Sequence, residues 1–326
     1  MTYDVVTMGE VMLRFTPPDN LRVEQADFLQ VHVAGSEANT AVGLSRLGLR
    51  VSYITRLTDN YLGHRIANAA REQGVDTSHI VWTDEDRVGV YFFEEAVEPR
   101  PSLVLYDRKN SAASKMQPKD LPDIFTPGGA RLFHVSGITV GISESSAETV
   151  RAAVQRAKAA GWQISFDLNY RAALWTYEKA EQVCDEFFAA ADLLFFPIRD
   201  AIQVFQCADG AAPATVTDQI AARYPNANIV LTLGEDGAIC RTKAGQYWEQ
   251  PAYQTTTRVG RIGGGDAFNA GFLCSYLQDG MTEAALKWGA ASAALKYTLP
   301  GDFPLIRRVE VERLIAQGRE TVTLRR

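Results

Sequence analysis

The sequence has few cysteines, no excess of basic residues and no long apolar run. Its four cysteines are scattered without a Cys-x-x-Cys pair, which favours buried free thiols in a reducing compartment over a disulfide framework or a zinc site. The formal net charge of -6 disfavours a nucleic-acid partner. No apolar stretch has membrane-spanning length, and the N-terminus lacks the pattern of a signal peptide. We therefore expect a cytoplasmic protein without a membrane partner.

The remaining composition is that of a soluble globular protein. Apolar residues make up 46% of the chain and charged residues 22%, both ordinary values. A length of 326 residues allows one large α/β domain, alone or with a smaller appendage.

Strand-like and helix-like patterns alternate along most of the chain. Residues 5–8 and 51–57 form apolar runs, and helical patterns follow them at 36–48 and 59–73. Similar apolar runs recur at 132–137, 163–167, 192–196 and 228–233. This alternation predicts an α/β fold with a central, mostly parallel sheet flanked by helices.

The alternation is interrupted by two strand-like segments, 88–93 and 102–108, which have no helix between them. They predict a small antiparallel sheet inserted into the α/β body, joined by short strands within 21–33. The sequence thus divides into a body (1–14, 35–87 and 109–326) and a β lid (15–34 and 88–108).

A glycine-rich stretch near the C-terminus carries the strongest chemical signal. Gly263, Gly264 and Gly265 lead directly into Asp266 and an apolar run with helical spacing. Glycines let backbone N–H groups approach a ligand, and the helix N-terminus adds a positive dipole end, so the stretch can hold an anion. Asp266 could then take a proton from an attacking hydroxyl, as phosphoryl transfer requires. The alternative is a plain glycine turn with an aspartate cap.

Two familiar glycine motifs do not fit this stretch. No Gly-Lys-Ser/Thr follows, so it is not a Walker-type phosphate loop. Its position and glycine spacing also differ from the dinucleotide-binding fingerprint, which argues against an oxidoreductase of that class.

Other polar residues lie where the predicted strands end. Asp167, Asn169 and Arg171 follow one strand, and the carboxyl ends of strands line the ligand crevice in open α/β sheets. Arg171 is a candidate clamp for a carboxylate or phosphate, or else a surface arginine. Another strand ends at Thr232, followed by Gly234 and Gly237, a pattern that suits a nucleotide phosphate loop or a hairpin turn.

The first predicted helix begins in another glycine-containing segment. Ser36 is a candidate N-cap, and Gly35 stands where the backbone must approach another group. Asn39, one turn later, is polar among small residues and faces either a ligand or solvent.

These segments together resemble the ribokinase-like (PfkB-type) carbohydrate kinases over essentially the whole chain. Gly35 to Asn39 is similar to the first family motif, and Gly263 to Asp266 to the second, more specific one. The resemblance implies a β lid over the sugar, Asp266 as catalytic base and the three glycines before it as anion hole. It implies ATP and Mg²⁺ as cofactors, with no metal site built from protein ligands. Residues implied along ATP are Thr232, Gly234, Gly237, Gly263 and Gly265.

Three segments are similar to the branch that acts on keto-deoxy sugar acids such as 2-keto-3-deoxygluconate. They are Gly9 to Arg14, Tyr106-x-Arg108, and Asp167-x-Asn169-x-Arg171. The resemblance implies phosphorylation of the terminal hydroxyl, giving a 6-phosphate. The implied substrate contacts are Gly35, Asn39, Tyr91, Tyr106, Arg108, Asp167, Asn169, Arg171 and Asp302.

A sugar acid also suits the residues physically, because Arg108 and Arg171 could both reach its carboxylate. Such a contact is worth on the order of 1.5–3 kcal/mol, or roughly ten- to a hundredfold in preference over a neutral sugar. The alternatives are a kinase of a neutral sugar such as fructose, and a non-catalytic sugar- or nucleotide-binding protein of the same fold.

Some properties stay open at this point. The sequence does not distinguish the gluconate from the galactonate epimer. Gly260 stands where the family often has an aspartate near its monovalent-cation site, which leaves potassium dependence undecided. Exposed lid strands could pair with those of a second copy, but no residue decides whether a homo-oligomer forms.

Overall fold

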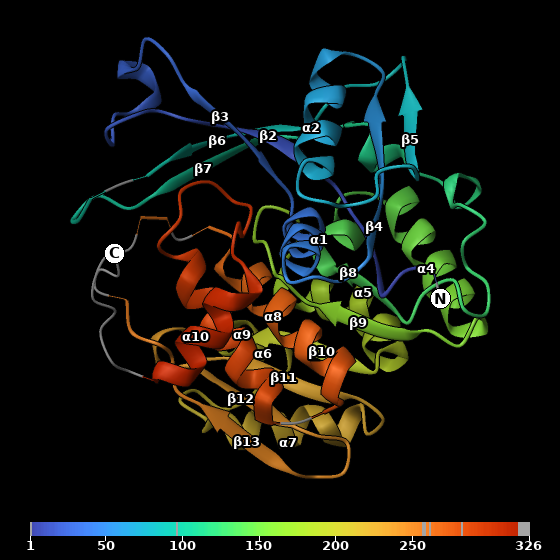
Figure 1. The fold of residues 1–326 in the computed structure, drawn as a ribbon, viewed down its shortest axis with the longest axis vertical. Coiled ribbons are helices and arrows are strands. Elements are labelled where there is room, and N and C mark those ends of the chain that lie inside the picture. The colour runs from blue at the N-terminus through green and yellow to red at the C-terminus, as the bar shows by residue number, and fades with distance from the viewer. Residues whose placement is uncertain (1, 96, 256–258, 261, 282, 319–326) are drawn as a thin grey trace.

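The computed structural model describes residues 2–95, 97–255, 259–260, 262–281 and 283–318. A nine-stranded sheet runs through the body in the order β13-β12-β11-β10-β9-β8-β1-β4-β5 (Figure 1). The pairs β11–β12 and β12–β13 are antiparallel, and the other pairs are parallel. The strand bounds are β1 (Val5–Met8), β4 (Val51–Thr58), β5 (Ile80–Thr83), β8 (Leu132–Ser136), β9 (Gln163–Asp167), β10 (Leu193–Pro197), β11 (Asn228–Thr232), β12 (Ala238–Arg241) and β13 (Tyr247–Gln250).

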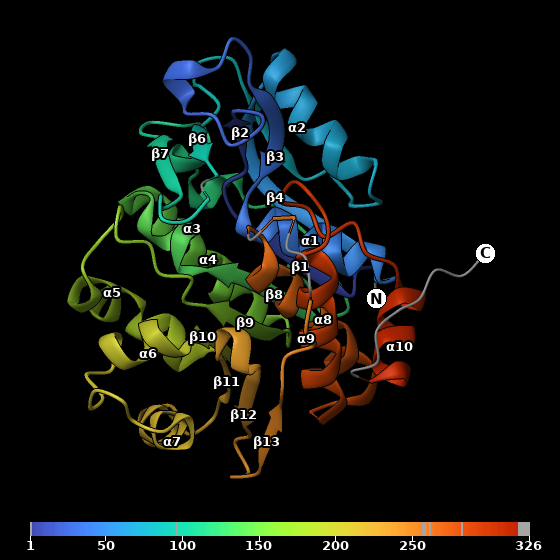
Figure 2. The ribbon, with the colours of Figure 1, turned by 90° about the vertical axis from the view of Figure 1, so that its left-hand side faces the viewer.

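Helices cover both faces of this sheet, as Figure 2 shows edge-on. One face packs against α1 (Ser36–Arg46), α2 (Tyr61–Arg71), α8 (Gly264–Asp279), α9 (Glu283–Lys296) and α10 (Arg308–Gln317). The other packs against α3 (Gly137–Gly141), α4 (Glu144–Ala159), α5 (Tyr177–Ala190), α6 (Ile198–Val204) and α7 (Pro213–Arg223). Strand β10 shows why the strands are apolar throughout: Leu193 and Phe195 enter one core, while Leu194 and Phe196 enter the other.

A second, four-stranded sheet lies at one end of the body, in the order β3-β2-β6-β7. Its strands are β2 (Met12–Thr16), β3 (Gln30–Ala34), β6 (Val90–Glu94) and β7 (Leu103–Asp107). Strands β2 and β6 are parallel, and the two outer pairs are antiparallel. The predicted fold class, a mostly parallel sheet flanked by helices with a smaller sheet, is therefore confirmed.

Three sequence-based expectations need correction. The small sheet begins at Met12, so residues 12–14 belong to it and not to the body. Within 21–33, only the last part is a strand, and Val23–Gln25 forms a short 3-10 helix. The small sheet is mixed and not antiparallel as predicted, because β2 and β6 pair in parallel. Helices α5 and α7, which pack against the sheet face opposite α8, were not predicted.

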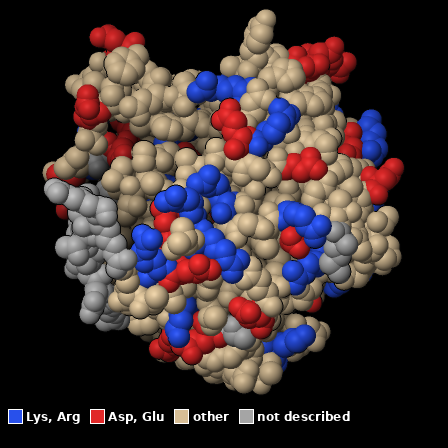
Figure 3. Space-filling view, in the orientation of Figure 1, with Lys and Arg blue, Asp and Glu red and all other residues tan. Residues whose placement is uncertain are grey.

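Charged side chains of both signs are mixed on the surface of the protein. Basic and acidic side chains are interspersed on the face shown in Figure 3. Within the described ranges, no helix is both long enough and apolar enough to cross a membrane.

The fold brings distant segments to one place. The N-terminus of α8, the start of α1 and the carboxyl end of β9 meet beneath the small sheet, where a cavity opens. Helices α1 and α8 pack against each other, which fixes the relative position of their N-terminal turns.

Candidate active site

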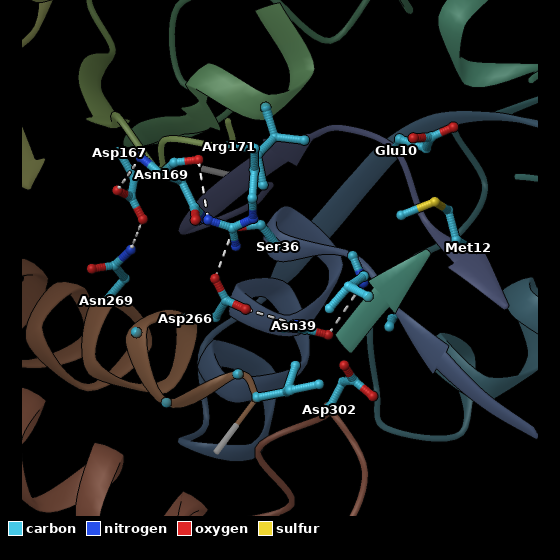
Figure 4. A pocket seen from close by; sticks show the side chains of 18 of the residues that line it. Glu10, Met12, Ser36, Asn39, Asp167, Asn169, Arg171, Asp266, Asn269 and Asp302 are labelled. Carbon is cyan, nitrogen blue, oxygen red and sulfur yellow. Dashed lines mark hydrogen bonds between the residues drawn. The ribbon is translucent and has the colours of Figure 1, made fainter. Parts of the chain in front are cut away.

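A cavity of about 360 Å³ lies between the small sheet and the body (Figure 4). It collects residues that are up to 292 positions apart in the sequence, from Glu10 to Asp302. The predicted residues that line it are Gly35, Asn39, Tyr91, Tyr106, Arg108, Asp167, Asn169, Arg171, Thr232, Gly263, Gly264, Gly265, Asp266 and Asp302. The structure thus brings together all the predicted substrate residues and the glycine loop around one space.

Asp266 lies in the first turn of α8, with its carboxylate directed toward α1 (Figure 4). Its Oδ1 accepts a hydrogen bond from Ser36 Oγ at 2.7 Å, and its Oδ2 accepts one from Asn39 Nδ2 at 2.7 Å. Burial raises the pKa of Asp266, while the bonds from Asn39 and Ser36 oppose that rise. The result is a fixed carboxylate that is more basic than a solvated one.

The first turn of α8 places backbone N–H groups without partners in their own helix at the same place. Gly263 is the N-cap of α8 with φ of 80°, and a Cβ atom there would lie 2.4 Å from the carbonyl oxygen of Asp302. Only glycine fits this left-handed, crowded position. The first intrahelical bond is donated by Ala267 to Gly263, at 2.9 Å. The N–H groups before Ala267 are therefore available to an anion.

The start of α1 differs from the prediction. Gly35, and not Ser36, is the N-cap, and Ser36 Oγ donates to Asp266 instead of capping its own helix. Asn169 Nδ2 donates to Ser36 Oγ at 2.6 Å, so a chain of hydrogen bonds runs from Asn169 through Ser36 to Asp266. The close approach expected at Gly35 is to the segment between β1 and β2, since a Cβ atom there would lie 2.3 Å from the carbonyl oxygen of Glu10.

A second buried carboxyl group, Asp167, lies at the end of β9. Its Oδ2 accepts a hydrogen bond from Asn269 Nδ2 at 2.7 Å, and its Oδ1 accepts one from the N–H of Asn169 at 3.0 Å. Burial, followed by the charge of Asp266, raises the pKa of Asp167 to about 7. Asp167 and Asp266 therefore do not ionise independently.

The two arginines have different surroundings. Arg171 donates from Nη1 to the carbonyl oxygens of Tyr170 at 2.9 Å and Asn169 at 3.3 Å. No ion pair of Arg171 is found within the part of the chain that the structure describes. Arg108 instead forms an ion pair with buried Glu10, which also accepts a bond from Ser111.

Arg108 and Asp302 are both held by aromatic neighbours. The Arg108 guanidinium lies 5.5 Å from the centre of the Tyr106 ring, and the Tyr106 and Tyr91 rings are 5.5 Å apart. The Tyr91 hydroxyl donates to Asp302 at 3.0 Å, and Arg14 pairs with the same carboxylate at 3.2 Å. The predicted lid residues thus form one connected wall of the cavity.

A smaller cavity of about 150 Å³ opens on the other side of the glycine loop. Gly234, Gly237, Ala293 and Tyr297 are among its lining residues. Thr232, Gly264 and Gly265 line both cavities, so the loop separates two adjoining spaces. The predicted nucleotide residue Gly263 lines the larger cavity and not the smaller one.

Some site residues were not predicted from the sequence. They are Glu10, Arg14, Ser36, Asn269 and Lys296. Asn269 could have been found, because it follows Asp266 by three positions and so shares a helix face with it. Glu10 and Arg14 lie in the Gly9 to Arg14 segment that carried the resemblance, but no contact was assigned to them, since their partners Arg108 and Asp302 are distant in the sequence.

Comparisons with known proteins agree with this geometry. A 2-dehydro-3-deoxygalactonokinase from Haloferax volcanii is 40% identical over 319 residues, covering 98% of each chain. The crystal structure of a 2-dehydro-3-deoxygluconokinase from Thermotoga maritima is 32% identical, with a TM-score of 0.87 over 97% of this chain and 99% of that one. A putative ribokinase II from E. coli, solved with ATP and Mg²⁺, is 19% identical with a TM-score of 0.86 and covers 97% and 100% of the two chains, a similarity of fold.

The family assignment follows from the same comparisons. A model of the pfkB family of carbohydrate kinases matches residues 2–304, which includes the glycine loop, Asp266 and the residues of both sheets. The chain belongs to the pfkB family of carbohydrate kinases.

Proposed function

We propose that the chain transfers the γ-phosphoryl group of ATP to the terminal hydroxyl of a 2-keto-3-deoxy sugar acid, forming the 6-phosphate. The observation that carries this proposal is the position of Asp266. Its carboxylate lines the larger cavity beside the free N–H groups of the glycine loop, and Arg108 and Arg171 line the same cavity. A base, an anion hole and two cations suited to an acid therefore surround one space.

The reaction uses these groups in a single displacement. Asp266 takes the proton of the terminal hydroxyl, the sugar oxygen attacks the γ-phosphorus in line, and ADP leaves with the electrons of the broken P–O bond. The N–H groups of Gly264 and Gly265, with the α8 dipole, stabilise the developing negative charge. Mg²⁺ bound to ATP would supply positive charge that neutralises the phosphates.

The walls of the smaller cavity would suit parts of a nucleotide, because their side chains are small or flat. Gly234 and Gly237 leave room for phosphates, while Ala293 and Tyr297 offer apolar surface to a base. Since Gly264 and Gly265 line both cavities, a γ-phosphate held at the loop would face the sugar hydroxyl near Asp266.

The acid group of the substrate accounts for the arginines. A carboxylate could replace the backbone carbonyls that Arg171 now contacts, and it could approach Arg108, whose buried Nε has no hydrogen-bond partner among the residues placed by the structure. Leaving a buried donor unsatisfied is costly, so the cavity favours a ligand with acceptors.

The two relatives reported above support keto-deoxy sugar acids but differ in the epimer named. The Thermotoga maritima protein is named for 2-dehydro-3-deoxygluconate, the substrate we propose first. The more similar Haloferax volcanii protein is named for the galactonate compound, which makes that epimer the second candidate.

A substrate panel with MgATP tests the proposal. The panel contains both keto-deoxy epimers, fructose, ribose and adenosine, and ADP release is measured for each. We expect kcat/KM for at least one keto-deoxy acid to exceed that for fructose by about ten- to a hundredfold. Equal or better turnover of fructose would show a neutral-sugar kinase. No ADP release with any sugar would show a binding protein that has lost turnover.

A further inference from the structure

Lys296, the last residue of α9, is a buried charge that the proposed reaction does not use. Its side chain is 0% exposed. Its Nζ donates to the carbonyl oxygens of Leu299 at 3.1 Å and Gly301 at 2.9 Å. No ion pair of Lys296 with a carboxylate is found in the described ranges. Lysine is rarely buried without such a pair, because an ammonium loses strong hydration there.

The position of Lys296 connects it to the glycine loop. A Cβ atom at Gly263 would lie 3.4 Å from Cε of Lys296 and 2.4 Å from the carbonyl oxygen of Asp302. The 299–302 segment, which Lys296 binds through two carbonyls, therefore packs directly against the N-cap of α8. One ammonium holds the segment that supports the anion hole and carries Asp302.

Ordinary helix capping does not explain this arrangement. A lysine near a helix C-terminus commonly binds the last carbonyls of its own helix. The acceptors here belong to residues three and five positions after the end of α9. The carbonyl dipoles of the following loop converge on the ammonium, which is the environment of a bound cation.

Charged groups from several elements face Lys296. Asp302 and Asp266 attract its charge, as does Glu95 at the end of the small sheet, whereas Arg14 on β2 repels it. His32 on β3 also faces it, and burial and the neighbouring cations lower the pKa of His32 to about 4, so His32 is neutral near pH 7. Burial lowers the pKa of Lys296 itself, and Asp302 is the largest influence opposing that change.

We propose that Lys296 is a built-in monovalent cation, a positioning residue that fixes the 299–302 segment beneath the glycine loop and adds positive potential where phosphoryl charge develops. The proposal rests on the proposed function in that its kinetic readout is kinase turnover. The proposal also makes a prediction about potassium dependence. The intact chain needs no added cation at this position, because the ammonium already binds the two carbonyls.

The test compares two substitutions of Lys296. Lys296→Ala removes the ammonium and leaves space between the carbonyls, whereas Lys296→Met removes the charge but fills the space. We expect kcat to fall about ten- to a hundredfold in both, with KM for the sugar acid changed less than about threefold. Potassium or ammonium chloride should restore most of kcat in the alanine variant and little in the methionine variant. Choline chloride at the same ionic strength is the salt control.

A matched control lies on the same helix. Lys287 is exposed and pairs with Glu283 one turn earlier, so Lys287→Ala should leave kcat and its salt response unchanged. Wild-type turnover in Lys296→Met, or loss of activity in Lys296→Ala that potassium does not restore, would overturn the proposal and leave Lys296 a structural residue.

A second readout does not depend on turnover. Potassium should raise the thermal unfolding midpoint of Lys296→Ala, relative to choline, and should leave those of Lys296→Met and the wild type unchanged. Failure of the proposed substrate would leave this result intact, whereas equal midpoints in potassium and choline for the alanine variant would contradict the cation site itself.

Discussion

The charged groups on the two walls of the larger cavity have different kinds of partner. On the body side, the carboxylates Asp266 and Asp167 are bound by neutral donors from serine and asparagine side chains. On the small-sheet side, charges are paired: Arg108 with Glu10, and Arg14 with Asp302. Neutral donors hold a carboxylate in place without removing its basicity, whereas an ion pair compensates it.

In the proposed reaction, this difference separates the group that reacts from the groups that orient the substrate. Asp266 keeps an accessible negative charge beside the anion hole, as a proton acceptor requires. The paired charges of the small sheet are already compensated, so they shape the cavity and present hydrogen-bond donors. Arg171 belongs to the body wall, where it donates to two backbone carbonyls and has no ion pair among the described residues, although its charge also acts on Asp167 and Asp266. A substrate carboxylate would therefore meet less competition there than at Arg108, which is paired with Glu10.

The largest expected effect comes from removing the base on the body wall. Asp266→Ala should lower kcat by about a thousandfold or more, because both the base and its ordered position are lost. ATP binding should persist, since the glycine loop remains. Turnover is measured by ADP release and ATP binding by calorimetry. Asp279→Ala, at the exposed end of the same helix, is the control, and near-native turnover in Asp266→Ala would refute the assignment.

The two arginines give the next test of the comparison. Arg171→Met should lower kcat/KM for the sugar acid about ten- to a hundredfold and leave that for fructose nearly unchanged. Arg108→Met should be made together with Glu10→Gln, so that no buried carboxylate is left unpaired. We expect a smaller loss there, about tenfold at most, because Glu10 already competes for Arg108.

Exposed Arg199 provides the matched control for these variants, since Arg199→Met removes a guanidinium that lies outside the cavity. An unchanged preference between sugar acid and fructose in both cavity variants would show that neither arginine binds the carboxylate. A larger loss at Arg108 than at Arg171 would reverse the contrast between the two walls.

The ionisation of Asp167, on the body wall, should make the stability of the protein depend on pH. Its pKa rises from 3.8 in the unfolded chain to about 7 in the folded one, so the folded state binds more protons between these values. Stability should therefore fall as pH rises from about 4 to about 7, and Asp167→Asn should remove that loss. We expect the variant to gain stability over wild type by a few kcal/mol at most from pH 5 to pH 8, measured by urea unfolding.

Parallel stability curves for wild type and Asp167→Asn across this pH range would contradict the raised pKa. Asp192→Asn is unsuitable as a control, because Asp192 accepts a bond from the N–H of Ile164. Asp209→Asn is the control instead, because Asp209 is exposed and lies outside the cavity.

The smallest expected effect concerns the outer edge of the small sheet. Strand β7 is an edge strand, and Leu103, Val104 and Leu105 are exposed on it in succession. An oligomer formed through these strands remains a prediction, which Leu105→Glu tests by light scattering. We expect a shift toward monomer with less than about threefold change in kcat. Val309→Glu on α10 is the control, and a wild type that is monomeric at all concentrations would contradict the prediction.

Local patterns were sufficient for much of the fold. The apolar runs of β1, β9 and β11 predicted strands because these strands are buried on both faces. Helix α7 was not predicted because its buried face is short and its position depends on packing against β11 and β12. That face extends from Val216 to Ala221. The strand-like segments predicted the small sheet, whereas the resemblance to a known family supplied its place over the sugar and the residue roles, which periodicity alone does not give.

The sequence by itself determined the glycine loop with Asp266 and the alternation of strands and helices, because these depend on neighbours within one or two turns of chain. Tertiary structure decided which groups meet Asp266 and the arginines. Ser36 joins Asp266 and Asn169, and Arg108 joins Glu10, through contacts across 98 to 230 positions. Such pairings depend on where α1, α8 and the two sheets pack, and no local pattern encodes that packing.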